Sequence, residues 1–150
     1  MNKGFSEKSS SIKEIYPSVC DIKQQRPLFL SGVSAGFPSP ADDYLDLKLD
    51  LNEHLVKNPA ATFFVRVAGD SMTGAGINDN DILIVDRSLE PSSNNIVIAV
   101  VNGELTVKRL IKKKNSCLLF AENPAYPPLT INDDTPLEIW GVATFAIHSL

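Results

Sequence analysis

The feature that most constrains the fold is a pair of strand-like runs joined by Asn102-Gly103. Asn-Gly is the strongest two-residue signal for a β-hairpin, because both central positions of the tight turn need positive φ angles. Residues 96–101 and 104–108, on either side, are rich in β-branched side chains. A two-residue turn fixes the register, so that Val97 is expected to lie opposite Lys108. Lys108 then shares a sheet face with apolar residues, which is an unusual environment for an ammonium group.

Other segments predict further strands and one short helix. The strand-like segments are residues 62–67, 82–85, 116–121 and 137–147, the last with a bend at Gly141. Residues 50–59 predict the helix, because Asp50 can cap it and Glu53 stands at the third position of a capping box. We expect Leu51, Leu55 and Val56 to face the body of the protein. The chain as a whole therefore predicts a mainly β fold.

The first part of the chain differs in composition from the rest. Residues 6–11 are polar and low in complexity, and Pro17 and Pro27 interrupt what little pattern follows. Such a segment buries too little apolar area to offset the entropy lost on ordering it. We therefore expect residues 1–35 to form a flexible N-terminal arm and residues 36–150 to form the folded domain.

A serine stands at a sharp bend after the predicted strand at residues 62–67. Ser71 follows Gly69-Asp70 directly, and two more glycines, Gly74 and Gly76, come within five residues of it. Glycine lets the backbone turn sharply and leaves the neighbouring side chain open to approach. Turns contain these residue types in any case, so the bend alone does not establish a role. Ser71 is a candidate nucleophile if another group activates it.

Lys108 is the candidate for that group, and it lies 37 residues after Ser71 (108 − 71 = 37). A serine between Gly-Asp and Met, with a lysine at this distance in Thr-Val-Lys, resembles the LexA-type family of self-cleaving serine peptidases. The match is best to its UmuD-like members. The resemblance runs from about residue 36 to 147, through segments 36–41, 50–52, 69–72, 81–86 and 106–108. It implies a LexA-like peptidase fold of twisted antiparallel strands, one or two short helices and an extended N-terminal arm.

The resemblance also implies an autocatalytic serine peptidase with a Ser-Lys dyad, in which Ser71 is the nucleophile and Lys108 the general base. A free lysine has a pKa of about 10.4, and burial among apolar groups can lower that pKa by as much as about 3–5. The implied cleavage site is Ala35-Gly36, which lies 36 residues before the nucleophile (71 − 35 = 36). Alanine stands here where UmuD proteins typically have cysteine. Backbone N–H groups around Ser71 are expected to stabilise the oxyanion.

The partners are implied by the resemblance alone. Family members take part in the SOS response to DNA damage, and a RecA–single-stranded DNA filament stimulates their cleavage. The shortened product is a homodimer that joins a Y-family polymerase catalytic subunit of the UmuC type for error-prone translesion synthesis. No cofactor is implied.

Composition excludes several other classes. A net charge of −4 does not indicate sequence-specific DNA binding, which usually needs a basic surface. Cys20 and Cys117 have neither metal-site nor disulfide spacing, which fits a reducing cytoplasm. No apolar run approaches the length of a membrane span. The acidic residues 78–81 do not make a calcium loop, because Leu83 stands where a ligand is needed. No metal site is predicted.

Three alternative functions have less support in the sequence. A Ser-His-Asp triad would need His54 or His148, neither in a catalytic context, and Thr73 departs from the G-x-S-x-G pattern. A repressor of the LexA or phage type would carry a helix-turn-helix domain before the cleavage site, where residues 1–35 show no helical pattern. The third alternative is a dimeric binding module that does not cleave itself.

Overall fold

The computed structural model describes residues 11–18, 23–29 and 46–150. The chain divides into two compact units: residues 1–18 with 58–150, and residues 19–57. The predicted cleavage site, Ala35-Gly36, lies outside the described residues. None of the described helices is long and apolar enough to span a membrane.

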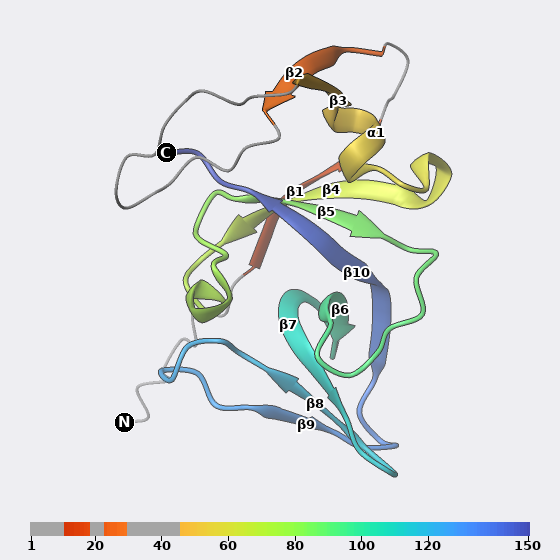
Figure 1. Ribbon diagram of the computed structural model, residues 1–150. Coiled ribbons are helices and arrows are strands. Elements are labelled where there is room, and N and C mark those ends of the chain that lie inside the picture. The colour runs from red at the N-terminus through yellow and green to blue at the C-terminus, as the bar shows by residue number, and fades with distance from the viewer. Residues whose placement is uncertain (1–10, 19–22, 30–45) are drawn as a thin grey trace. The chain divides into compact units, whose positions relative to one another are not determined.

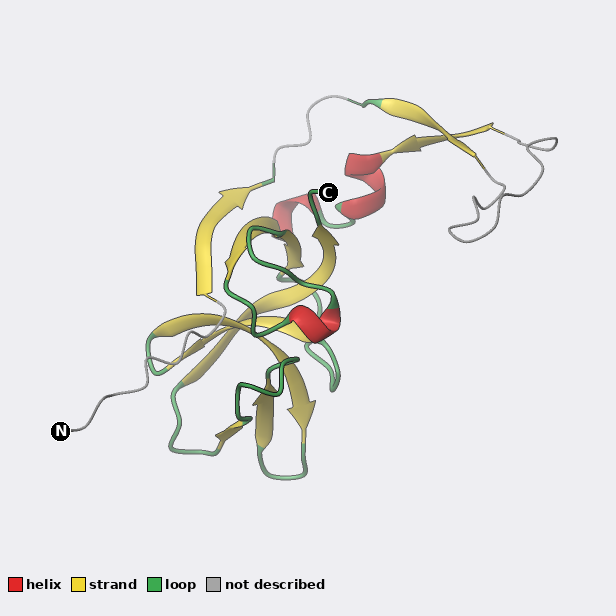
Figure 2. Cartoon of the chain, turned by 90° about the vertical axis from the view of Figure 1, so that its left-hand side faces the viewer, coloured by secondary structure: helices red, strands yellow, loops and turns green. Residues whose placement is uncertain are grey.

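The larger unit is built on one curled antiparallel sheet, in the order β1-β4-β5-β10-β6-β7-β8-β9 (Figures 1 and 2). Its strands are β1 (Ser11–Pro17), β4 (Thr62–Ala68), β5 (Ile82–Asp86), β6 (Ile96–Val101), β7 (Glu104–Lys112), β8 (Cys117–Phe120), β9 (Leu129–Ile131) and β10 (Leu137–Ile147). Short 3-10 turns lie at Pro59–Ala61 and Thr73–Ala75. The expected LexA-like, mainly β fold of twisted antiparallel strands is confirmed.

The predicted hairpin is present, with the register that its turn requires. Asn102 and Gly103 have φ angles of 50° and 82°, and Val97 pairs with Lys108. Strand β10, drawn in blue in Figure 1, pairs with β5 at one end and with β6 at the other. Its register with β6 shifts between Ile139 and Gly141, where the sequence predicted a bend.

Alternation along β6 and β7 separates two hydrophobic clusters. One contains Ile98 and Val107 together with Met72, and the other contains Val97 and Leu110. Both faces of the hairpin are therefore covered, which explains its nearly continuous apolar sequence. Lys108 pairs with Val97 and so belongs to the second face.

The smaller unit contains a two-stranded sheet and the helix. Strands β2 (Gln25–Phe29) and β3 (Asp46–Asp50) pair antiparallel, and α1 (Leu51–Leu55) follows at once. The Asp50 carboxylate accepts hydrogen bonds from the backbone N–H groups of Asn52 and Glu53, so the predicted cap is confirmed. The prediction for Leu51 was wrong: it is 58% exposed, because it is the first residue of the short helix and only a little over one turn follows it.

Strand β1 lies within the segment expected to be an arm. It pairs antiparallel with β4 along its length, and Ser11 also pairs with Thr106 of β7. Sequence patterns did not indicate this strand, because Ile12 and Ile15 are its only aliphatic residues and Pro17 ends it.

Candidate active site

The structure brings Ser71 and Lys108 together. The Lys108 ammonium nitrogen donates a hydrogen bond of 3.1 Å to the Ser71 hydroxyl oxygen. Ser71 is fully buried, and Lys108 is 8% exposed. Strand β7 presents the lysine, and the turn after β4 presents the serine. In general, burial away from water favours the neutral amine of a lysine, which is the form that a base requires.

Two features at the start and the middle of the turn fix the position of Ser71. Gly69 has a φ angle of 89°, and its N–H donates to the Asp79 carboxylate at 2.8 Å. Met72, directly after the serine, is fully buried in the first hydrophobic cluster. The carbonyl oxygen of Met72 accepts a hydrogen bond of 3.2 Å from the N–H of Ile77, which is also buried. This bond closes the turn.

The turn also contacts the loop that follows β8. The N–H of Gly74 donates to the carbonyl oxygen of Glu122 at 2.7 Å. The Asn123 side-chain amide donates to the carbonyl oxygen of Asp70 at 2.9 Å. These bonds connect the residues before and after the serine to one loop.

Tyr126, in the same loop, contacts Asp70, the residue before Ser71, and lies near Lys108. Its hydroxyl donates to the Asp70 carboxylate at 2.5 Å, and the Lys108 nitrogen lies 6.0 Å from its ring centre. The hydrogen bond to Asp70 raises the pKa of the tyrosine, and partial burial adds to this effect. The phenol therefore stays protonated at neutral pH and keeps its donor role. Sequence analysis did not identify Tyr126, since no local pattern indicates what a loop will contact.

Comparison with known proteins identifies the family. The model of the Peptidase S24-like family matches residues 27–144. The chain belongs to the Peptidase S24-like family. SamA of Salmonella typhimurium is 46% identical over 134 residues, which cover 89% of this chain and 93% of SamA. MucA of Escherichia coli is 46% identical over 125 residues, 83% of each protein. ImpA of Escherichia coli is 44% identical over 129 residues, 85% of this chain and 87% of ImpA.

These relatives are UmuD-like proteins, and the similarity extends over most of each of them. This S24 protein is therefore a UmuD-like member of a serine peptidase family, of the kind with an accessory role in SOS mutagenesis. The resemblance inferred from the Gly-Asp-Ser-Met and Thr-Val-Lys segments is confirmed at that level.

Other candidate groups of this S24 protein lie elsewhere. His54 is in α1 of the smaller unit, and His148 pairs with the buried Asp81 carboxylate at 2.7 Å. Burial raises the pKa of the Cys117 thiol, which keeps it protonated and unreactive at neutral pH. Within the described part of the chain, no group of three or more His, Cys, Asp or Glu side chains could hold a metal ion.

Proposed function

We propose that this S24 protein cleaves its own Ala35–Gly36 bond with Ser71 as nucleophile and Lys108 as general base. The observation that carries the proposal is the 3.1 Å hydrogen bond between these two buried side chains, in a chain of this family. A serine hydroxyl attacks a peptide carbonyl only when a base removes its proton, and a buried neutral lysine is such a base.

The reaction proceeds in two stages. Lys108 takes the hydroxyl proton, and the Ser71 oxygen attacks the Ala35 carbonyl carbon. The C–N bond to Gly36 then breaks, and the lysine gives its proton to the departing amine. Water hydrolyses the ester between Ser71 and Ala35, which releases the arm and restores the serine. Tyr126 and Asp70 contribute by positioning the serine turn against the lysine.

The substrate is a segment of the protein itself, which sets the expected rate. A tethered bond has a high effective concentration near the nucleophile, so modest chemical activation suffices. The Ala35–Gly36 bond can be cut once in each chain, and we expect a single turnover without a general peptide-binding pocket.

The proposal extends to the cellular role on the strength of the UmuD-like relatives. Cleavage is stimulated by a RecA–single-stranded DNA filament, and residues 36–150 form a homodimer. This dimer serves as the accessory subunit of a Y-family, UmuC-like polymerase that copies damaged DNA. The similarity over most of SamA, MucA and ImpA supports this role over that of a repressor.

The test is incubation of the purified full-length chain across pH 6–10, with intact mass measured over time. We expect one break, at Ala35–Gly36, with a rate that increases with pH as the lysine loses its proton. Ser71→Ala and Lys108→Ala should abolish it. Lys112→Ala is the matched control, because Lys112 is exposed at the end of the same strand; its rate should equal that of the parent.

Two results would contradict the proposal. The first is a break that persists in Ser71→Ala or Lys108→Ala. The second is an intact chain at every pH, even after addition of a RecA filament assembled on single-stranded DNA. The second result would leave a UmuD-like binding module that does not cleave itself.

A further inference from the structure

Strand β1 covers one edge of the sheet. Among the described strands, β4 has only β5 and β1 as neighbours along its length, so β1 alone covers its outer edge. Ile12 lies opposite Val67 and Ile15 opposite Val65. Val65 and Val67 are fully buried members of the first hydrophobic cluster, and Ile12 packs against that cluster. Removal of β1 would expose both a backbone edge and part of this cluster.

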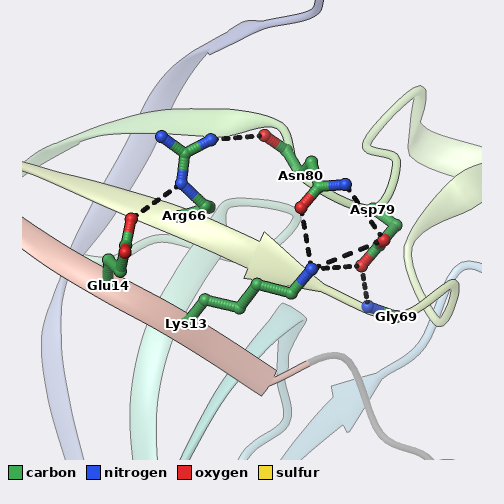
Figure 3. A network of polar contacts seen from close by, with 6 residues as sticks. All are labelled: Lys13, Glu14, Arg66, Gly69, Asp79 and Asn80. Atoms are coloured by element: carbon green, nitrogen blue, oxygen red, sulfur yellow. Dashed lines mark hydrogen bonds and ion pairs between the residues drawn. The ribbon is translucent and has the colours of Figure 1, made fainter.

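Polar side chains fix the register of β1 on β4 (Figure 3). Glu14 pairs with Arg66 at 2.9 Å. The nitrogen of Lys13, the residue before Glu14, donates to the Asn80 side-chain oxygen at 2.7 Å and lies 3.3 Å from the Asp79 carboxylate. The edge therefore presents a cation at Arg66 and an acidic site at Asp79, and the bound strand supplies the complementary charges.

The attachment of β1 is nevertheless weak. Both ion pairs are exposed, and such pairs contribute little to stability. Ile15 is 41% exposed, the pairing is irregular between Ile12 and Glu14, and Pro17 has no N–H to donate. The pairing of this seven-residue strand with β4 therefore depends on its covalent connection to the rest of the chain. The connection keeps β1 near β4 at an effective concentration of order millimolar.

From these observations we infer that the β4 edge is a strand-acceptor site for an extended segment of a partner protein, blocked by β1 until the arm is cut. The second part of this inference rests on the proposed self-cleavage, because β1 precedes Ala35–Gly36 in the chain. Cleavage turns residues 1–35 into a separate peptide whose described strands, β1 on β4 and β2 on β3, lose their covalent connection, and this peptide dissociates at cellular concentrations. The family match begins at residue 27, so β1 lies outside the matched domain.

The edge defines the chemistry of the segment it accepts. The segment adds antiparallel to β4 through main-chain hydrogen bonds, as in other cases of strand addition. It carries an acidic residue opposite Arg66 and apolar residues opposite Val65 and Val67. A basic residue next to the acid reaches Asp79 and Asn80, as Lys13 does.

The test uses full-length chains that all carry Ser71→Ala. None of these chains can cleave itself, so the result does not depend on cleavage. The probe is a fluorescent peptide with the sequence of residues 11–18, and binding is followed by anisotropy. Glu14→Arg in the host places its own β1 against Arg66 with like charge. We expect this host to bind the probe about threefold more tightly than the parent, an effect of the size that one exposed ion pair supports. Glu138→Arg is the control, because it makes the same change at an exposed position of β10. This host should behave as the parent.

A charge swap tests the register. Adding Arg66→Glu to the Glu14→Arg host restores an attractive pair within the host, and probe binding should fall back to the level of the parent. In a host with Arg66→Glu alone, a probe carrying Glu14→Arg should bind at least fivefold more tightly than the original probe. Equal binding of the two probes to that host would overturn the inference, as would equal binding of the original probe to the Glu14→Arg, Glu138→Arg and parent hosts. Dimers that form only with Glu14→Arg, and that the probe does not dissociate, would assign the edge to a second copy of the chain.

A separate measurement addresses cleavage. Hydrogen exchange of the β4 amides should become at least tenfold faster in the wild-type chain after processing. Unchanged exchange in a fully cleaved sample would overturn the switch. If the wild-type chain never cleaves, the proposed function fails, while the peptide experiment still decides whether the edge accepts a strand.

Discussion

At the scale of single residues, the position of Ser71 depends on Gly74, where the structure leaves no room for a side chain. A Cβ atom at Gly74 would lie 2.5 Å from the carbonyl oxygen of Glu122, the same oxygen that accepts the Gly74 N–H. Because the obstacle is backbone, Gly74→Ala must move the serine turn away from the loop that carries Tyr126. We expect a loss of about 1–3 kcal/mol in unfolding free energy and at least a tenfold slower cleavage, measured by urea denaturation and mass spectrometry.

Gly103→Ala is the matched control for this prediction. Gly103 has a φ angle of 82° and open space where a Cβ would be. Alanine there costs about 1–2 kcal/mol through its left-handed backbone conformation, but this turn comes before the start of β7, five residues before Lys108 (108 − 103 = 5). Stability should therefore fall in both variants, and the cleavage rate only in Gly74→Ala. A Gly74→Ala chain that cleaves at the parental rate would show that the turn and the loop are not coupled.

At the scale of elements, the sequence predicted the turns and strands whose formation depends on residues close to them in the chain. The Asn102-Gly103 turn fixed both the hairpin and the side of the sheet on which Lys108 lies, and these predictions are confirmed. Strands β4, β5, β8 and β10 were also predicted, because each is a β-rich run between polar turns. The pairing of Ser71 with Lys108 was suggested by family resemblance, since no rule of sequence spacing relates a turn to a strand 37 residues away.

Elements that depend on distant partners were missed. Strand β1 forms because β4 offers an edge, and its own sequence is mostly polar. Strands β2 and β3 were missed for a similar reason, since they pair with each other across the long segment 30–45 and no two-residue turn marks them as a hairpin. The contact of Tyr126 with Asp70 joins a loop to a turn 56 residues away, and composition cannot reveal such a contact.

The polar contacts of β1 predict that acid releases this element. Hydrogen bonds, first from Gly69 and then from Lys13, lower the pKa of Asp79. Hydrogen bonds from Tyr16 and Arg66 lower the pKa of Glu14. Because both values lie below those of the free side chains, the stabilisation is complete above about pH 4–5 and is lost as the pH falls through the lowered values. In the Ser71→Ala chain, exchange of the β4 amides, corrected for intrinsic rates, should accelerate below about pH 4.

Lys13→Gln provides the check on that prediction. It removes the cation from the Asp79 site but leaves the Glu14–Arg66 pair. We expect faster exchange at neutral pH and a smaller change on acidification. Equal acid sensitivity in the two chains would mean that Asp79 does not contribute to the attachment of β1.

At the scale of the whole molecule, Asp86 connects three strands of the sheet. It ends β5, lies opposite Thr62 of β4 on one side, and lies opposite Val142 of β10 on the other. Its buried carboxylate accepts hydrogen bonds from the Asn58 side chain at 2.7 Å and the Ser88 N–H at 2.8 Å. Burial raises the pKa of this carboxyl group, but these hydrogen bonds outweigh burial, so the net pKa is lowered.

This balance predicts how the stability of the larger unit depends on pH. A carboxyl group with a lowered pKa in the folded state stabilises that state fully above about pH 4–5, and the effect disappears as the pH falls through the lowered value. Asp86→Asn keeps the shape but removes the charge that strengthens both hydrogen bonds. We expect a loss of about 1–3 kcal/mol at pH 7, measured by urea denaturation, with a smaller loss at pH 3. Asp134→Asn, in the exposed turn after β9, should unfold like the parent at both pH values. If Asp86→Asn were equally destabilising at pH 7 and pH 3, then the shape of the side chain, and not its charge, would account for its contribution to stability.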